Sequence, residues 1–226
     1  MSYTIEDAER MMKNKLSDHD TFQFQCKMCG QCCRNRTEPI VLTGADIFRI
    51  AVSLKASMEA VIPKYTQWCI GENSHIPVLL LKERPDGSCR FMSRGRCSIQ
   101  DCKPAVCEMF PLGRYYNVRK KEYHYFLNPN TCSKGCKGGR IWTLDEWLKE
   151  YHIEKNDQMG FAWNKMVVAA TNITSKLDKS KIEGNLLSVL FDALYLNYKT
   201  DEPYVEQTQR NTKLLLDSFR DKFHLI

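Results

Sequence analysis

The stretch Cys26-Lys27-Met28-Cys29-Gly30-Gln31-Cys32-Cys33 places four thiols within eight residues. Two residues separate the first three cysteines, so their thiolates can turn toward one centre, and Gly30 permits a tight backbone beside it. Thiolates at this spacing bind a metal ion or an iron–sulfur cluster. Because neighbouring side chains generally diverge, we expect Cys33 to serve a different iron or a different centre from Cys32.

Two further groups of cysteines lie downstream of this stretch. They are Cys89, Cys97, Cys102 and Cys107 in the second group, and Cys132 and Cys136 in the third. Both groups contain glycine and proline and show little regular periodicity, which is typical of loops shaped around ligands. We therefore predict that three separate segments of the chain supply ligands to one metal site or to two.

The composition bears on the compartment in which these thiols reside. The chain has 226 residues and 11 cysteines, and it is long enough to bury a core without disulfide staples. It has no apolar run of transmembrane length, and its N-terminal residues are polar, without the apolar core of a signal peptide. We therefore expect a cytoplasmic protein that binds metal and no membrane. A disulfide framework remains the alternative, although the odd number of cysteines argues against it.

The formal net charge is +6, and one local group of basic residues stands out. Its members are Arg114, Arg119, Lys120, Lys121, Lys134, Lys137 and Arg140. Such a group suits nucleic acid or an acidic partner. No nucleic-acid-binding motif accompanies it, so we favour a solvated face that also compensates a thiolate-rich site, and we do not expect nucleic acid as a partner.

Hydrophobic spacing predicts an α+β fold that is mainly α-helical. We expect helices over 5–16, 43–54, 58–68, 143–151, 158–177, 183–198 and 202–223. Thr43 and Thr143 each precede an acidic residue by three positions, which is the pattern of an N-terminal cap. Two β-hairpins are also expected. One covers 76–92 and delivers Cys89 on its return strand, and the other covers 114–127.

The distribution of cysteines predicts the domain organisation. The last of them is Cys136, and helical patterns dominate from Ile141 onward. We therefore expect a cysteine-cluster metal-binding domain over 1–140, with its motif region at 22–140. A helical C-terminal extension over 141–226 would pack on it as a cap. Cys69 lies outside every motif, and we expect it to be a small buried hydrophobic residue.

The spacings also bear on the identity of the metal. Structural zinc sites usually take two short-spaced pairs, and only the first group here contains CxxC. The CxxCxxC run with a distant fourth cysteine, and with Pro111 four residues after Cys107, partly matches ferredoxin ligation. Ten clustered cysteines also exceed one tetrahedral site. We favour an iron–sulfur cluster of the 4Fe-4S type and keep zinc as the alternative.

Three segments together resemble a known family: CKMCGQCC, then CRFMSRGRCSIQDCKPAVCEMFPLGRYY, then a cysteine after the second hairpin. They resemble the YkgJ-type cysteine-cluster proteins, also called the CxxCxxCC zinc- or iron-chelating domain family, over about residues 22–140. The resemblance implies metal chelation by Cys26, Cys29, Cys32, Cys33, Cys89, Cys97, Cys107 and Cys132. Cys102 and Cys136 are additional to that pattern, and we include them as further metal ligands.

The chain departs from the family pattern at Gln100, Lys103 and Glu108. The family often has tyrosine at the first of these positions and arginine at the other two. Losing these arginines weakens the charge-assisted hydrogen bond that each would make to a carboxylate or a sulfide.

Two classes of function follow from these observations. The first is an iron–sulfur protein that transfers electrons or supports the redox or modification reaction of a protein partner. The second is a zinc-stabilised interaction module without catalysis. A metallochaperone fits less well, because ligands from three segments favour retention of the metal. We find no glycine-rich S-adenosylmethionine loop and assign no catalytic residue. A reactive cysteine paired with His124 or His152 would explain fewer of the cysteines.

Overall fold

The structure is a computed structural model, and it describes residues 13–34, 39–117, 119–120, 122–128, 135, 138–151 and 153–225, without the side chains of 154–157. The chain forms two compact units. The helical unit consists of Pro39–Lys82 and Asp157–Ile226, and the cysteine unit consists of Tyr3–Glu38 and Glu83–Asn156. This division differs from the expected boundary after residue 140. Segment 39–82 groups with the C-terminal helices, and segment 141–156 groups with the cysteines.

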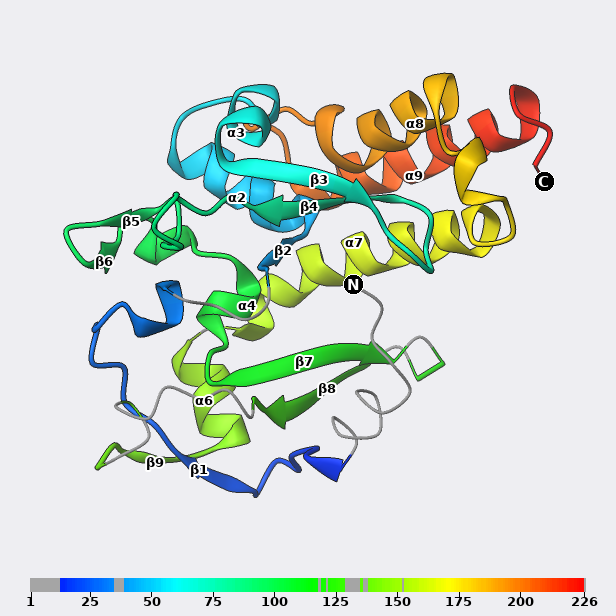
Figure 1. Ribbon diagram of the computed structural model, residues 1–226. Coiled ribbons are helices and arrows are strands. Elements are labelled where there is room, and N and C mark those ends of the chain that lie inside the picture. Colours follow the sequence, from blue (N-terminus) through cyan, green and yellow to red (C-terminus); the bar gives the residue numbers. More distant parts are fainter. Residues whose placement is uncertain are drawn as a thin grey trace. The chain divides into compact units, whose positions relative to one another are not determined.

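The helical unit surrounds one small antiparallel sheet. Its elements are β2 (Val41–Leu42), α2 (Gly44–Ser53), α3 (Met58–Tyr65), β3 (Thr66–Ile70), β4 (Pro77–Leu81), most of α7 (Ile153–Thr174), η3 (Lys179–Lys181), α8 (Gly184–Phe191), the π-helical segment η4 (Asp192–Leu196) and α9 (Tyr204–Asp221). Strand β4 lies between β2 and β3, and α8 packs against it (Figure 1). Most of the expected helices are therefore present, with small shifts at their ends.

Local signals explain where two of these helices begin and end. The Thr43 hydroxyl accepts a hydrogen bond from the Asp46 N–H at 3.0 Å, and the Asp46 carboxylate accepts one from the Thr43 N–H at 2.9 Å, so the predicted cap of α2 is confirmed. Helix α3 ends at Tyr65, earlier than expected. Trp68 instead lies in β3, because the chain after Thr66 is extended and pairs with β4.

Helix α9 buries polar side chains in the helical unit, and the chain's own backbone satisfies them. Gln207 accepts a hydrogen bond from the Lys199 N–H at 2.7 Å and donates to the carbonyl oxygens of Lys199 and Glu202 at 2.9 and 3.0 Å. Asn211 donates to the Asn197 carbonyl at 2.8 Å. A buried polar group that is bonded in this way avoids a large desolvation cost.

The cysteine unit is built from shorter elements. They are β1 (Thr21–Gln23), η1 (Gln31–Cys33), β5 (Met92–Ser93), β6 (Arg96–Cys97), η2 (Gln100–Cys102), α4 (Ala105–Glu108), β7 (Leu112–Asn117), β8 (Glu122–Leu127), β9 (Ile141–Thr143) and α6 (Leu144–Glu150). Strands β7 and β8 pair antiparallel, which confirms the second expected hairpin (Figure 1). Strand β1 pairs with β9, so the chain before the first cysteine motif is tied to residues more than a hundred positions away.

The first expected hairpin, over 76–92, is wrong in its pairing. Strand β4 pairs with β2 and β3, and the returning chain bonds only through one bridge between Glu83 and Cys89. The turn is local: the Gly87 N–H donates to the Arg84 carbonyl at 2.9 Å, and the Ser88 hydroxyl donates to the Asp86 carboxylate at 2.6 Å. This turn closes a small loop that delivers Cys89 without a long return strand.

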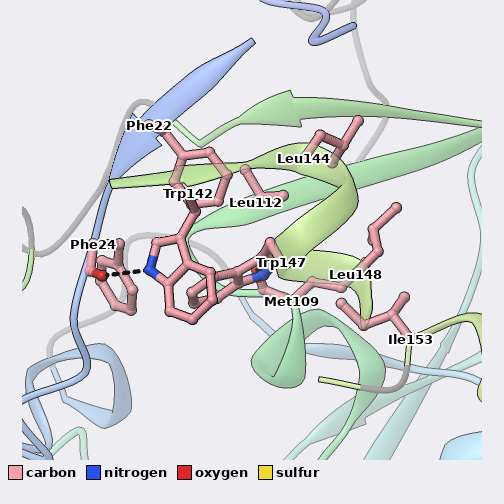
Figure 2. Close-up of a cluster of buried hydrophobic side chains, with 9 residues drawn as sticks. All are labelled: Phe22, Phe24, Met109, Leu112, Trp142, Leu144, Trp147, Leu148 and Ile153. Atoms are coloured by element: carbon pink, nitrogen blue, oxygen red, sulfur yellow. Dashed lines mark hydrogen bonds between the residues drawn. The ribbon is translucent and has the colours of Figure 1, made fainter. Parts of the chain in front are cut away.

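An aromatic cluster forms the core of the cysteine unit, and Figure 2 shows its side chains converging from β1, β7, β9, α6, the start of α7 and the residues just after β1 and α4. Its members are Phe22, Phe24, Met109, Leu112, Trp142, Leu144, Trp147, Leu148 and Ile153. Trp147 is 1% exposed, and its ring lies 5.2 Å from that of Trp142 at an interplanar angle of 84°. Edge-to-face pairs of this kind stabilise a core beyond simple burial.

Helices and small antiparallel sheets together make an α+β fold in which helix predominates, as the sequence predicts. The expected helix over 5–16 falls mostly outside the described residues. Among the helices that the structure describes, none combines the length and the apolar character needed to cross a membrane.

Candidate metal centre

The chain that enters the first cysteine motif is held by backbone and indole hydrogen bonds. The Phe24 N–H donates to the Arg140 carbonyl at 3.0 Å, and the Gln25 N–H donates to the Gly135 carbonyl at 2.9 Å. The Trp142 indole N–H donates to the Phe24 carbonyl at 2.9 Å (Figure 2). Strand pairing and the aromatic cluster therefore fix the position from which Cys26 departs.

The motif itself is a tight loop with two residues in the left-handed region. Met28 has φ of 49° and Gly30 has φ of 68°, so the chain turns sharply after Cys26 and again after Cys29. The Met28 N–H points at the Cys26 sulfur at 3.4 Å. The 3-10 turn η1 then carries Cys32 and Cys33, and the Cys33 N–H donates to the Gly30 carbonyl at 3.1 Å.

The motif loop packs against the short hairpin β5–β6. A Cβ atom added at Gly30 would lie 2.8 Å from the Gly95 carbonyl oxygen and 2.8 Å from Met92 Cε, so only glycine fits there. Arg94 and Gly95, at the tip of the hairpin, both have positive φ, as a tight two-residue turn requires. Cys97 lies opposite Met92 in this hairpin. The close approach therefore brings the first cysteine segment beside the second.

A backbone hydrogen bond links the two segments directly, because the Cys89 N–H donates to the Cys33 carbonyl at 2.8 Å. The sulfur atoms of Cys32 and Cys33 lie 3.9 Å apart. The expectation that these neighbouring side chains diverge is therefore wrong. The 3-10 turn brings both sulfurs to one side, where an extended chain would direct them to opposite sides.

The remaining cysteines of the second segment sit on short helical turns. Cys102 is buried at the end of η2, and its N–H donates to the Ile99 carbonyl at 3.1 Å. Cys107 lies in α4, and its N–H donates to the Pro104 carbonyl at 2.8 Å. Just after α4, the Met109 carbonyl accepts a hydrogen bond from the Trp147 indole at 3.3 Å. The aromatic cluster thus supports the segment that carries Cys107 as well as the one that carries Cys26.

The electrostatics of Cys33 show which thiols lie near one another. The hydrogen-bonding contact with the Cys32 thiol raises the pKa of Cys33 most. Burial raises this pKa further, and so does the negative charge of the Cys32, Cys89 and Cys107 thiolates. Thiols of both the first and the second segment therefore contribute to the electrostatic surroundings of Cys33, and the Cys32 sulfur contacts it at 3.9 Å.

Cys97 extends this group of thiols. Burial is the main cause that raises the pKa of Cys97, while a hydrogen bond from the Ile99 backbone lowers it. The thiolates of Cys89 and Cys102 raise the same pKa, and the Lys103 ammonium lowers it. Cys89 is thus a shared neighbour of Cys33 and Cys97.

The donor chemistry of this group fits a thiophilic metal. Thiols that raise one another's pKa bind protons tightly, and a cation relieves the repulsion between their thiolates when the protons leave. All nine cysteines of the described residues are outside disulfides. Within those same residues, no three His, Cys, Asp or Glu side chains are close enough to hold one ion. The structure therefore places Cys32, Cys33, Cys89, Cys97, Cys102 and Cys107 on two adjoining segments without setting a coordination geometry.

The other predicted ligands are placed differently. Cys26 and Cys29 are exposed on the motif loop, and the Cys26 thiolate helps to raise the pKa of Tyr151, whose burial is the main cause of that shift. Cys132 and Cys136 lie outside the described residues. Cys69 belongs to the helical unit and is exposed, so the prediction of a buried hydrophobic residue is wrong. It lies on β3, the edge strand of the sheet, where burial is incomplete.

His124 has a role within the β7–β8 hairpin. Its ring is 6% exposed and stacks on Tyr115 at 5.0 Å, and its Nε2 lies 3.1 Å from a Glu122 carboxylate oxygen. His152 lies outside the described residues.

Two members of the expected basic group stack on aromatic rings. The Arg114 guanidinium lies 3.9 Å from the centroid of the Tyr123 ring, and the Arg140 guanidinium lies 3.8 Å from that of Trp142.

Sequence reasoning missed the role of Trp142 and Trp147 in supporting the cysteine segments. Their aromatic character predicts core residues, and both are buried. What the sequence does not reveal is that their indole N–H groups bond to carbonyls next to the cysteine motifs. The spacing of the cysteines does not predict these hydrogen bonds.

One comparison with known proteins found a match. Residues 25–133 match the profile of the CxxCxxCC family, whose description is "Putative zinc- or iron-chelating domain". This chain carries a CxxCxxCC domain. The match covers the first two cysteine groups and Cys132, so the domain is a metal-binding one. Comparison with curated proteins and with solved structures gave no match.

Proposed function

We propose that the CxxCxxCC domain holds an iron–sulfur cluster through its clustered cysteines. One observation carries this proposal: the Cys89 N–H donates to the Cys33 carbonyl at 2.8 Å, which joins the first cysteine segment to the second. These two segments carry Cys32, Cys33, Cys89, Cys97, Cys102 and Cys107, and six thiolates are more than one tetrahedral ion requires. The family pattern adds Cys26, Cys29 and Cys132 as ligands, and Cys136 is a further candidate. We favour the 4Fe-4S type.

An iron–sulfur cluster supplies one-electron transfer when bound, and the protein sets its potential through hydrogen bonds to sulfur and through solvent exposure. In this chain the Met28 N–H is already directed at the Cys26 sulfur, and Lys103 lies close enough to Cys97 to lower its pKa. These groups stabilise the thiolate form of their cysteines. The domain would then transfer electrons to a protein partner or support a redox or modification reaction of that partner.

One observation favours the second candidate function, a zinc-stabilised interaction module. With a zinc–sulfur distance of about 2.3 Å, the sulfurs of a tetrahedral site lie about 3.8 Å apart. The sulfurs of Cys32 and Cys33 are separated by 3.9 Å, which suits two ligands of a single ion. In an iron–sulfur cluster each iron usually takes its own thiolate, which holds the cysteine sulfurs further apart.

Purification without oxygen distinguishes the two candidates. We expect a brown protein that contains iron and acid-labile sulfide and that bleaches in air. Cys33→Ser should lose most of the visible absorbance, because Cys33 contacts the Cys32 sulfur and its carbonyl bonds to the segment that carries Cys89. Cys69→Ser is the matched control and should keep the absorbance, because Cys69 lies on β3 of the helical unit. A colourless protein with stoichiometric zinc would exclude the iron–sulfur proposal and support the zinc module.

A further inference from the structure

Basic residues adjoin most of the cysteines in the first two groups. Five of these eight cysteines have a lysine or arginine as an immediate neighbour in the sequence. These neighbours and Arg94, at the tip of the β5–β6 hairpin, are named the basic rim. The basic rim consists of Lys27, Arg34, Arg90, Arg94, Arg96 and Lys103.

The basic rim faces solvent. Its members are exposed, except for Lys103, which is half-buried. The neighbouring thiols of Cys89 and Cys102 are buried. Cys89 therefore directs its thiol into the unit while the adjacent Arg90 extends a positive charge outward.

Over the residues that the structure describes, the basic rim lacks carboxylate partners, as do exposed lysines such as Lys176 and Lys179, whereas several arginines elsewhere are paired. In the described part of the chain, none of its six members lies within 4.0 Å of a carboxylate oxygen. Lys27 instead donates to the Gln25 amide oxygen at 2.6 Å, and Arg34 donates to the Met92 sulfur at 3.1 Å. In the helical unit, by contrast, Arg210 pairs with Glu202 at 3.1 Å and Arg220 with Asp217 at 2.6 Å.

The charge of the two cysteine segments is therefore strongly one-sided. Over 26–34 and 89–108 the sequence has the six members of the basic rim and two acidic residues, Asp101 and Glu108. A surface with unpaired charges of one sign attracts a partner of the opposite sign and raises the rate of encounter. The chemistry that this surface recognises is a set of carboxylates or phosphates.

Two exposed apolar side chains decide between these chemistries. Met28 is 48% exposed and lies between Cys26 and Cys29, and Val106 is 39% exposed and precedes Cys107. Protein interfaces combine apolar contacts with surrounding charge, and methionine is enriched in them. Aromatic platforms, on which nucleic-acid bases stack, do not occur among the exposed residues of 26–34 and 89–108. The combination favours an acidic protein surface over nucleic acid.

We propose that the basic rim, with Met28 and Val106, is the docking surface for an acidic protein partner. This inference rests on the proposed function, because it supplies the partner that a redox or interaction module needs. Docking at this surface places the partner beside the thiols of both cysteine segments. A partner bound there is within the short reach that electron exchange or metal-dependent recognition requires.

The proposal is tested with defined probes on the metal-loaded full chain. The first probe is a short synthetic peptide rich in glutamate with interspersed leucine. The second replaces leucine with serine, and the third is a single-stranded oligonucleotide of equal charge. The variant is Arg90→Glu with Arg96→Glu. Its matched control is Lys176→Glu with Lys179→Glu, which changes the net charge equally on exposed residues of the helical unit.

We expect the leucine-containing peptide to bind more tightly than both other probes, with an affinity that falls as salt rises. Arg90→Glu with Arg96→Glu should weaken binding of this peptide by about tenfold or more, and the control should leave it unchanged. Equal weakening by the variant and the control would overturn the proposal. So would an oligonucleotide that binds as tightly as the peptide, since that result indicates nucleic acid as the partner.

Metal content and visible absorbance, measured on the same samples, separate the two proposals. If the arginines only compensate the charge of the metal centre, Arg90→Glu with Arg96→Glu loses metal. In that case its peptide binding equals that of the unchanged protein. A colourless zinc protein that binds the peptide through the rim removes the iron–sulfur proposal and keeps the docking surface. A brown protein whose peptide binding is unchanged by Arg90→Glu with Arg96→Glu removes the docking surface and keeps the iron–sulfur proposal.

Discussion

The helical unit and the cysteine unit differ in how their polar groups are satisfied. In the helical unit, buried side chains such as Gln207 and Asn211 bond to carbonyl groups of the same unit. In the cysteine unit, the sulfur of Cys33 has the thiols of other cysteines as neighbours. The helical unit thus satisfies these buried amides with its own backbone, whereas the cysteine unit gathers thiols that a cation would bind. We therefore expect the helical unit to keep its structure without metal and the cysteine segments to lose theirs.

Removing the metal should have the largest effect of the changes considered, and it should destabilise the cysteine unit far more than the helical unit. Structural zinc contributes about 10–16 kcal/mol of apparent binding free energy in small domains, which rivals the stability of about 5–15 kcal/mol of a whole domain. We expect chelation to abolish hydrogen-exchange protection over 26–34 and 83–108, while 39–82 and 158–221 stay protected. The measurement is hydrogen exchange with mass spectrometry, before and after chelation. Unchanged protection of the cysteine segments would show that the metal does not organise them.

Truncating a tryptophan in each unit should have the next largest effect. Trp147→Ala empties the centre of the aromatic cluster and should cost about 3–5 kcal/mol in the unfolding of the cysteine unit. Trp68→Ala is the control in the helical unit, and it should cost about 1 kcal/mol, since Trp68 is half-exposed and contacts Phe191 edge-on. Chemical denaturation of the metal-loaded protein gives both values. Equal losses would mean that the aromatic cluster does not hold the cysteine unit together.

The smallest effect concerns a pair of equivalent helix caps, one in each unit. Thr43 caps α2, and Thr143 caps α6 with the same reciprocal hydrogen bonds. Replacing either threonine with alanine should cost about 1 kcal/mol, because one backbone N–H loses its acceptor. Only Thr143→Ala should also speed the release of metal to a competing chelator, since α6 carries Trp147. Equal release rates for the two variants would contradict the link between the aromatic cluster and the cysteine segments.

Local features of the fold could be predicted from the sequence. Both caps depend on residues three positions apart, and the β7–β8 hairpin depends on two neighbouring strands. The cysteine motifs likewise identify the family, because their spacing is a local pattern. These signals lie within a few residues of each other, so they do not depend on the rest of the fold.

Features that depend on distant residues could not be predicted in this way. Segment 39–82 belongs with the C-terminal helices because β4 and α8 pack together, which no spacing in the sequence reveals. The β4 strand pairs with β2 and β3 and not with the chain that follows it, for the same reason. At the site, the approach of Cys32 and Cys33 depends on a 3-10 turn, and the exposure of Cys69 depends on its place at a sheet edge.

The two indole hydrogen bonds have a consequence for the entropy of assembly. Trp142 holds the carbonyl of Phe24, just before the first cysteine, and Trp147 holds the carbonyl of Met109, just after Cys107. The aromatic cluster thereby closes the long loop between the two cysteine segments. The free energy cost of closing a flexible loop grows with its length. Here the packing of the aromatic cluster offsets that cost before any metal binds. An incoming metal has only to order short turns whose ends are already fixed in space.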